Sequence, residues 1–458
     1  MKSCIGLFAT VLLTSCAYSP TDFSAQKSRQ LPADLEGYTQ PNDNVIVSEK
    51  WWTVFASNQL SQLMDSMAEG NLSLQEARLR VERARLLLEQ SRADNYIGVT
   101  GGLSGASNED LDNGGTSNSS SARLGVSYTF DVWGSRAATQ LAASLDIDSQ
   151  NFAQRNAALQ VQVLLATEYF NWLSLTQRFG IAEQNLDAAQ RLLDLVNIRF
   201  EAGDASGIEV SQQQNTLLGA QAERLRLANQ ITISQRAISA LLGREALDVS
   251  LTPVPLAQLA LPDIPLYQPA KVIGARPDVQ LADVALRQAD ISVYQAGIQG
   301  LPGLALSGDL TVTDILDLAS GWRLGAAISS AITLFDGGRI DAGEKIADVD
   351  LQLAWNNYRA TTLSAAQNLL DALANYAYYK RVYQLDEASV VNNEQLYRLA
   401  EIRYKAGDTD FLNLLGAQRS WFQSQLTLIS SYQLSLAAAA AVYQQAGGRP
   451  LVVEDTSN

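Results

Sequence analysis

Two long stretches of the chain carry apolar and small residues at helical spacing and almost no helix-breaking residues. Residues 344–406 contain neither Gly nor Pro, and residues 135–202 contain a single Gly. In the later stretch Ile346, Leu353 and Ala360 recur at heptad spacing, which is typical of a helix that packs along a seam. As one helix, residues 344–406 would extend ~95 Å at ~1.5 Å per residue. The pattern predicts two helices far longer than those of ordinary globular domains.

Each long helix is followed by a Gly-Asp pair and then by a second helical stretch. The pair at 203–204 precedes a helix expected over about 208–242, and the pair at 407–408 precedes one expected over about 410–446. We interpret each Gly-Asp pair as a turn that reverses the chain. The sequence therefore predicts two long antiparallel helical hairpins.

Four short segments instead alternate apolar and polar residues, as strands with one apolar face do. They lie near residues 96–104, 122–131, 304–312 and 322–334. Their lengths suit tilted strands that span a bilayer. One face of an ordinary antiparallel sandwich has the same alternation, but four strands in two matched pairs, behind a signal peptide, favour the membrane interpretation. Phe130 falls on the apolar face while its repeat partner Phe335 has the opposite parity, which a bulge or a strand end before Phe335 would explain.

Polar segments join the strands of each pair. Residues 105–121 are almost wholly Gly, Ser, Asn and acidic residues, and residues 313–321 join the second pair. Such composition predicts solvated loops. Because the other strand ends lead into the helices, we expect both loops to face the cell exterior.

The chain is internally duplicated at a spacing of about 205 residues. The pair Phe-Asp at 130–131 recurs at 335–336, and Gly-Arg at 243–244 recurs at 448–449, both 205 apart. The segment Arg-Phe-Glu-Ala-Gly-Asp at 199–204 recurs as Arg-Tyr-Lys-Ala-Gly-Asp only 204 apart. This predicts a one-residue gap in each interval and a pseudo-symmetric subunit.

The organisation expected from these patterns has six parts. They are a signal peptide (1–15), a polar tether (16–50), a first repeat (51–244), an extended Pro-rich connector (245–270), a second repeat (271–449) and a C-terminal tail (450–458). The connector holds Pro253, Pro255, Pro262, Pro265 and Pro269, which cannot continue a helix.

Composition removes much of the chemistry that an enzyme would use. The chain has no His, and its two Cys are Cys4 and Cys16, so the body has neither imidazole nor thiol. The formal net charge of −15 argues against a nucleic-acid partner. No stretch reaches the ~18–20 apolar residues of a transmembrane helix. We predict no catalytic residue, no metal site and no bound cofactor.

The first 16 residues resemble a bacterial lipoprotein leader. A short apolar stretch follows Lys2, and Leu-Thr-Ser-Cys at 13–16 resembles the processing site of such proteins. On this interpretation Cys16 becomes the first mature residue and carries a diacylglycerol and an N-acyl chain. The alternative is an ordinary signal peptide with an incidental cysteine.

Four strands do not close a barrel, and open strand edges are not tolerated in lipid. The smallest bacterial barrels have about eight strands, so the subunit must associate. Two copies would supply eight strands and three copies would supply twelve, and physics alone leaves the number open.

Several motifs, in their order, resemble the outer-membrane efflux factors of the TolC/NodT type along essentially the whole chain. They are Trp51-Trp52 with Phe55 and Leu60, Asn71-Leu72-Ser73-Leu74 with Ala77, Phe130-Asp131-Val132-Trp133-Gly134, Ala275-Arg276-Pro277-Asp278-Val279, Leu334-Phe335-Asp336-Gly337-Gly338-Arg339 and Arg403-Tyr404-Lys405-Ala406-Gly407. The resemblance implies a membrane α+β protein that forms a homotrimer, with a twelve-stranded barrel in the outer-membrane lipid and a helical periplasmic tunnel. It also implies docking to a periplasmic adaptor (membrane fusion) protein and an inner-membrane efflux pump.

The resemblance places a gate at the periplasmic tip, just past the second turn. By motif, Leu412 takes the apolar constricting position. Asn413 and Gly416 match positions that carry acids in well-known members, so an acidic ring is in doubt, although Asp408 and Asp410 lie close by.

A latch between hairpins is implied in the same way. Tyr404 and Glu209 match a tyrosine and a carboxylate that bond between hairpins in the family. The alternative is that Glu209 and Asp410 are helix N-terminal charges favoured by the helix dipole, and both roles are compatible.

The function predicted is a passive duct that exports drugs, toxic compounds or metal ions, with energy supplied by the pump. A trimeric stalk or adhesin without a conduit would explain the lipid anchor and the heptads but not the two strand pairs. A periplasmic hydrolase with paired carboxylates would need acids in a cleft, which the pattern does not offer.

Overall fold

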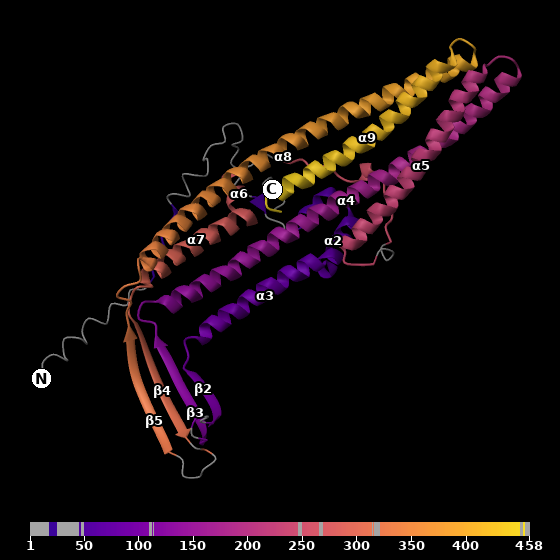
Figure 1. Ribbon diagram of the computed structural model, residues 1–458. Coiled ribbons are helices and arrows are strands. Elements are labelled where there is room, and N and C mark those ends of the chain that lie inside the picture. Colours follow the sequence, from indigo (N-terminus) through magenta and orange to yellow (C-terminus); the bar gives the residue numbers. More distant parts are fainter. Residues whose placement is uncertain are drawn as a thin grey trace. The chain divides into compact units, whose positions relative to one another are not determined.

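The long helices of the structure begin and end within a few residues of the predicted ones. Helix α4 covers Ser135–Glu201 and α5 covers Gly207–Leu241, and in the second half α8 covers Arg339–Lys405 and α9 covers Phe411–Gln445. Gly180 does not interrupt α4, since one Gly costs a helix only about 1 kcal/mol relative to Ala. The two predicted hairpins are confirmed (Figure 1).

This computed structural model describes most of the chain. The described residues are 18–24, 45–46, 50–109, 112, 114–245, 250–264, 269–313, 315, 321–448 and 452–453. They divide into two compact units. The strand unit comprises Met1–Gln30, Arg78–Ala153 and Gln280–Thr361, and the hairpin unit comprises Leu31–Ala77, Gln154–Val279 and Thr362–Asn458.

The strand unit contains one four-stranded antiparallel sheet. Its strands are β2 (Gly98–Glu109), β3 (Thr116–Phe130), β4 (Gly303–Thr313) and β5 (Gly321–Ala331), in the order β2-β3-β4-β5. The middle pairing joins the two repeats, because β3 pairs with β4 (Figure 1). Within the described residues, β2 and β5 each have one unpaired edge.

The first polar loop is shorter than predicted. β2 continues to Glu109 and β3 starts at Thr116, so most of the segment 105–121 lies in the ladder, with Gly105 opposite Ser120. Strand pairing uses backbone groups, and small polar side chains do not oppose it. Ser104 and Ser121 even share a hydrogen bond between their hydroxyl groups of 2.6 Å.

The last strand ends earlier than predicted. β5 stops at Ala331, whereas the alternation in the sequence extends to residue 334. Phe335 therefore lies beyond the strand, and its different parity from Phe130 follows from a strand end rather than a bulge.

The sheet has one apolar face, and that face is exposed in the single chain. Cross-strand neighbours Leu103, Ala122, Val312 and Trp322 form one row of it. Leu103 is 85% exposed and Trp322 is 69% exposed. Soluble proteins rarely leave such a continuous apolar surface open to water, so this face is suited to lipid.

Along the chain, a helix precedes each pair of strands. Helix α3 (Leu72–Ala93) precedes β2, and α7 (Pro277–Ile298) precedes β4. In the strand unit, Val284 and Ile291 of α7 pack on Ala138 and Leu145 of α4.

Part of the predicted tether packs against the strand unit. The Tyr18 hydroxyl donates to an Asp290 carboxylate oxygen at 2.5 Å, and the Thr21 hydroxyl donates to the other at 2.6 Å. Phe23 is buried and stacks on Trp355. These residues are therefore not a free polymer linker: two aromatic rings among polar neighbours hold them to the body.

The two hairpins have equal lengths. α4 and α8 each contain 67 residues, and α5 and α9 each contain 35. The repeat spacing is 204 throughout this region, and Gly243, at φ +68°, corresponds to Gly447, at φ +78°. The predicted one-residue gap between the turns and the Gly-Arg pairs therefore falls directly before Arg449, where the extra residue is the second of two glycines after α9.

The core of the hairpin unit combines aromatic and aliphatic side chains. Trp51 belongs to a short 3-10 helix, η1 (Trp51–Phe55), and stacks on Tyr443 of α9 with ring centres 5.7 Å apart. Helix α2 (Asn58–Gly70) adds Leu60 to the same cluster. The Trp pair of the sequence thus belongs to the core.

Helix α9 is the one helix among the described residues that is long and apolar enough to cross a membrane. However, 61% of its most apolar window is buried inside the protein. Its apolar side chains therefore serve the core of the hairpin unit.

The connector is not wholly extended. It contains a 3-10 turn, η2 (Leu256–Gln258), and helix α6 (Pro269–Gly274) starts within the predicted connector. Proline is accepted at a first helical position because its missing N–H has no partner there. The tyrosine hydroxyls of Tyr376 and Tyr432 donate to the carbonyls of Pro262 and Leu259 and fix the connector to the core.

The hairpin unit also contains two short strands that pair with each other. β1 (Val45–Ile46) pairs antiparallel with β6 (Val452–Val453), which joins parts of the predicted tether and tail.

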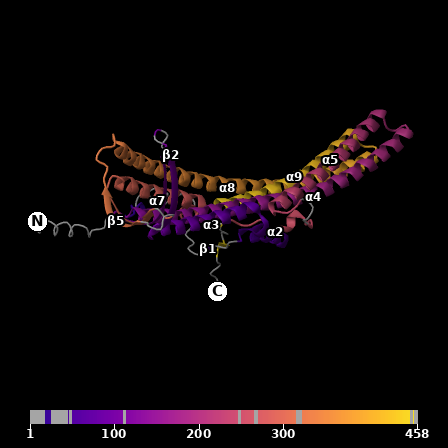
Figure 2. The ribbon, with the colours of Figure 1, turned by 60° about the horizontal axis from the view of Figure 1, so that its bottom comes forward.

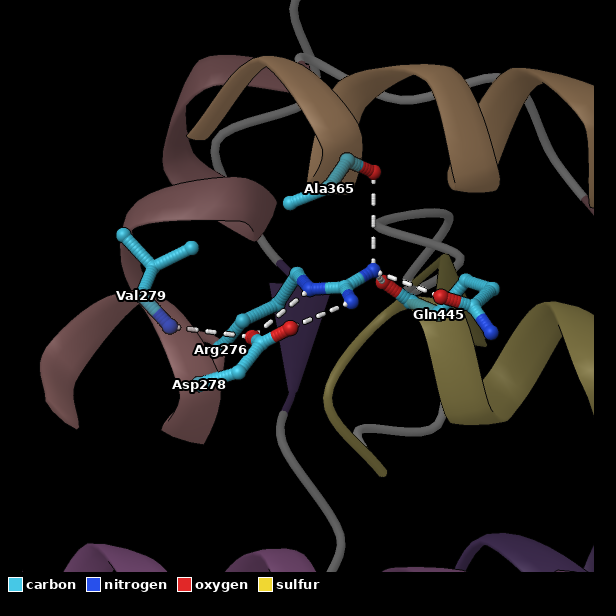
Figure 3. Close-up of polar contacts among 5 residues, drawn as sticks. All are labelled: Arg276, Asp278, Val279, Ala365 and Gln445. Carbon is cyan, nitrogen blue, oxygen red and sulfur yellow. Dashed lines mark hydrogen bonds and ion pairs between the residues drawn. The ribbon is translucent and has the colours of Figure 1, made fainter. Parts of the chain in front are cut away.

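The Arg-Pro-Asp motif forms a buried charged joint (Figure 3). The Arg276 guanidinium donates from Nε and Nη2 to both carboxylate oxygens of Asp278, at 3.0 and 2.8 Å. Its Nη1 donates to the Gln445 carbonyl at 2.8 Å and to the Ala365 carbonyl at 3.5 Å. One side chain therefore connects the start of α7 to α8 and to the last residue of α9.

Candidate gate at the turns of the long hairpins

The two Gly-Asp turns end α4 and α8 in the same way. Gly203 and Gly407 have φ of +83° and +82°, a left-handed conformation that favours glycine. The next amides, of Asp204 and Asp408, donate to the carbonyls of Arg199 and Arg403, both at 2.8 Å. Both turns lie at the same end of the hairpin unit (Figures 1 and 2).

Acidic side chains cap the helices that follow. Ser206 and Glu209 form a capping box at the start of α5, and Asp410 accepts from the Asn413 amide at 2.9 Å at the start of α9. Such groups satisfy free amides and complement the helix dipole. The helix-capping role of Glu209 and Asp410 is therefore confirmed.

The predicted gate residues share one exposed surface. Leu412 is 61% exposed, and Asn413, Gly416 and Asp408 are exposed as well. Residues 412 and 416 lie one turn apart on α9, so their exposed positions form a stripe along the helix. This stripe is a helix face that no other described residue covers.

The opposite face of α9 is buried in a small cluster at the tip. Phe411, Leu414 and Leu415 pack with Val196 of α4 and Tyr404 of α8. This tip cluster joins the two hairpins of one chain.

Arg199 is a member of this site that sequence reasoning missed. Its guanidinium lies 4.7 Å from the Tyr404 ring centre, and its Nη1 donates to the Tyr404 carbonyl at 3.3 Å. A signal was present, because Arg199 belongs to the repeated motif that also contains Tyr404.

Tyr404 itself is buried, and its hydroxyl proton has no acceptor among the described residues, whereas the Arg199 guanidinium lies on the oxygen side. Burial raises the pKa of Tyr404, an effect that the Arg199 charge opposes and the Glu209 charge reinforces. The predicted bond to Glu209 is not formed within one chain, and the latch stays a prediction about neighbouring hairpins. The predicted lipid site, Cys16, and the signal peptide lie outside the described residues.

An amphipathic sheet with open edges, together with long paired helices, defines a class of protein: channels that cross a membrane as strands and continue as helices. The family model described as "Outer membrane efflux protein" matches residues 63–244 and 269–448. The chain belongs to this family, and the two matched segments coincide with the two repeats.

Curated relatives agree along nearly the whole chain. The chain is 30% identical to the nodulation protein T of Rhizobium leguminosarum bv. viciae, covering 94% of this chain and 88% of that protein. It is 28% identical to the pyoverdine export outer membrane protein OpmQ of Pseudomonas putida, covering 91% and 92%. OpmQ is named as an outer-membrane export protein.

Solved structures show the same fold. CusC matches with a TM-score of 0.80 at 21% identity, covering 95% of this chain and 99% of CusC. The outer-membrane channel OprN matches with a TM-score of 0.79 at 23% identity, covering 91% and 96%. The predictions of family, fold class, outer-membrane location and export-channel function are confirmed.

Proposed function

We propose that three copies of this chain form one passive export duct, held in the outer membrane by a shared barrel and by lipid on Cys16. An inner-membrane pump supplies the energy, and a periplasmic adaptor joins it to the duct. The cargo class proposed is drugs, toxic compounds or metal ions.

The observation that carries the association of subunits is the open sheet, and the family resemblance supports three copies. β2 and β5 each leave one edge unpaired among the described residues, and unpaired backbone groups in hydrocarbon cost several kcal/mol each. The exposed apolar face supports the placement of these edges in lipid. Pairing β5 of one subunit with β2 of the next removes every edge.

Disulfide trapping across that junction tests the proposal. The body of the chain contains no cysteine, so Leu103→Cys on β2 is combined in turn with Trp322→Cys, Leu324→Cys or Ala326→Cys on β5. At least one combination is expected to give covalent trimers under denaturing electrophoresis after mild oxidation.

The matched control places both cysteines inside one sheet. Leu124→Cys with Leu310→Cys lie opposite each other on β3 and β4, so oxidation links them within one chain. If the control pair oxidises and every β2–β5 combination stays monomeric, the proposed junction is wrong.

The cargo is tested in cells. A deletion strain is expected to become sensitive to compounds of one of the proposed classes, and the plasmid-borne gene restores resistance. Unchanged susceptibility across panels of drugs, solvents and metals would contradict the cargo classes proposed.

A further inference from the structure

A cavity of about 620 Å³ lies behind the tip cluster, inside the hairpin unit. Residues of α4, α8 and α9 line it, and these helices run together toward the turns (Figure 2). The predicted gate residues Leu412, Asn413 and Gly416 are absent from its lining and lie on the exposed stripe instead. The cavity is therefore separate from the predicted constriction, although the predicted latch residue Tyr404 also lines it.

Buried polar atoms of three side chains on its wall lack hydrogen-bond partners of matching type among the described residues. They are the Tyr404 hydroxyl, both amide atoms of Gln418 and the indole N–H of Trp421, none of which is hydrogen-bonded to a described residue. Tyr404 and Gln418 are each only 3% exposed. Buried polar atoms are hydrogen-bonded in the great majority of cases, so such a set indicates that an occupant supplies the missing partners.

The wall also offers a flat aromatic surface. The rings of Tyr397 and Trp421 stack with centres 5.1 Å apart and planes 10° apart, and both residues line the cavity. Aromatic ligands stack on such surfaces with favourable geometry.

The charged side chains of the lining are mostly paired with one another. Lys405 donates to Glu401 at 2.7 Å, and Arg191 contributes a second positive charge to the lining. Two cations against one carboxylate disfavour a cationic occupant.

We propose that this cavity binds a small planar aromatic molecule that carries an adjacent hydrogen-bond donor and acceptor, as a primary or cyclic amide does. The unpaired carbonyl and NH₂ of Gln418 form a reciprocal pair with the ligand amide. The Trp421 indole N–H and the Tyr404 hydroxyl donate to further acceptors. The volume lies in the range of small-molecule sites.

The bound ligand contacts α4 from the first hairpin and α8 and α9 from the second. It therefore stabilises the packing of the two hairpins at the tip. This inference needs one chain only and does not rest on the proposed trimer.

Fluorine NMR on the full-length protein in detergent tests the site with 4-fluorobenzamide as the probe. Saturable line broadening is expected, with a Kd on the order of millimolar for a ligand of this size. Gln418→Leu keeps the side-chain bulk and removes both amide atoms, and it is expected to weaken binding at least ~10-fold, because hydrogen bonds are lost. 4-Fluorotoluene, which lacks the amide, is expected to respond equally in wild type and variant.

The matched control is Gln423→Leu, an exposed glutamine of the same helix outside the cavity lining, with binding expected as in the wild type. Thermal melting shows whether each variant folds. If Gln418→Leu melts higher than wild type and the wild type shows no saturable response to the probe, the cavity is a packing defect that holds water only. Equal binding by wild type and Gln418→Leu would likewise overturn the proposal.

Discussion

At the scale of single residues, Arg276 shows how one side chain holds several elements. It is 6% exposed and makes a two-pronged contact with Asp278 while it also binds the carbonyl at the end of α9. A planar guanidinium suits this arrangement, since its donors are fixed in a fork. The sequence motif alone carries no such information, because the partner carbonyls come from residues that are distant in the chain.

Removing this side chain is expected to destabilise the hairpin unit. Arg276→Met removes the guanidinium donors of the Gln445 carbonyl and of the Asp278 carboxylate, which keeps the Val279 amide as a donor, at a cost of ~1.5–3 kcal/mol for charged hydrogen bonds. A lower thermal midpoint in detergent measures it. The control is Arg287→Met in α7, whose pair with Asp283 has an arginine side chain 54% exposed, so that the loss is at most ~1 kcal/mol. Equal midpoints for both variants would contradict the role of Arg276.

The ion pair of Arg276 with Asp278 gives a prediction about the pH dependence of the thermal midpoint. Burial raises the pKa of Asp278, but the hydrogen bonds and charge of Arg276 outweigh it, so that the pKa lies below its ordinary value. A group with a lowered pKa in the folded state stabilises fully above its unfolded pKa and loses that contribution as pH falls through the folded one. The midpoint difference between wild type and Arg276→Met is therefore expected to shrink under acid conditions. A difference that stays constant, or grows, on acidification would show that the ion pair is not its source.

The gate residues also belong to this scale. A latch between neighbouring hairpins would stabilise the closed state of the channel by ~1.5–3 kcal/mol for each hydrogen bond to a carboxylate. Tyr404→Phe with Glu209→Gln is expected to raise single-channel conductance in planar bilayers, and the glutamine keeps the capping box intact. Leu412→Ala is expected to act similarly by widening the constriction. Asn375→Ala, exposed on α8, is the silent control, and a double variant that forms normal trimers without higher conductance would rule out the latch.

At the scale of elements, periodicity predicted the helices well and the strands less completely. A long heptad pattern of apolar residues specifies a helix even when it contains one Gly, as Gly180 in α4 shows. Strand ends follow backbone pairing, which sequence composition does not reveal, so the Gly, Ser and Asn residues of 105–109 and 116–121 carried a loop signal although they lie in β2 and β3.

The same limit applies to the N-terminal segment and to the tip. Tyr18 and Phe23 look like isolated aromatics in a polar stretch, and only the fold brings Asp290 and Trp355 to them. The exposed stripe of α9 follows from helical spacing, whereas the packing of Arg199 on Tyr404 depends on how the two hairpins meet.

The turn between β2 and β3 gives a prediction about orientation. Gly114 is exposed, has φ of +66° and has open space around its Cβ position, so an insertion there disturbs little. An epitope inserted after Gly114 is expected to bind antibody on intact cells. Labelling that requires permeabilisation of the outer membrane would mean that the sheet has the opposite orientation.

At the scale of the whole molecule, the barrel and the lipid proposed on Cys16 would be two independent anchors. A lipid anchor with few acyl chains binds membranes reversibly, whereas a closed barrel satisfies all its backbone groups within the bilayer. Cys16→Ser is therefore expected to abolish acyl labelling and to leave the protein in the outer-membrane fraction. Recovery of the variant as a soluble periplasmic protein would contradict the barrel.

Because the two hairpins have equal lengths, a change in the length of one requires the same change in the other. Seven residues removed from each helix of one hairpin would withdraw its turn by about 10 Å, and Tyr404, Phe411 and Leu414 would lose the neighbours that bury them. A working variant with a shorter reach thus needs matched deletions in α4, α5, α8 and α9. The reach of this duct changes only in concerted steps, so its length is a shared property of both halves of the gene.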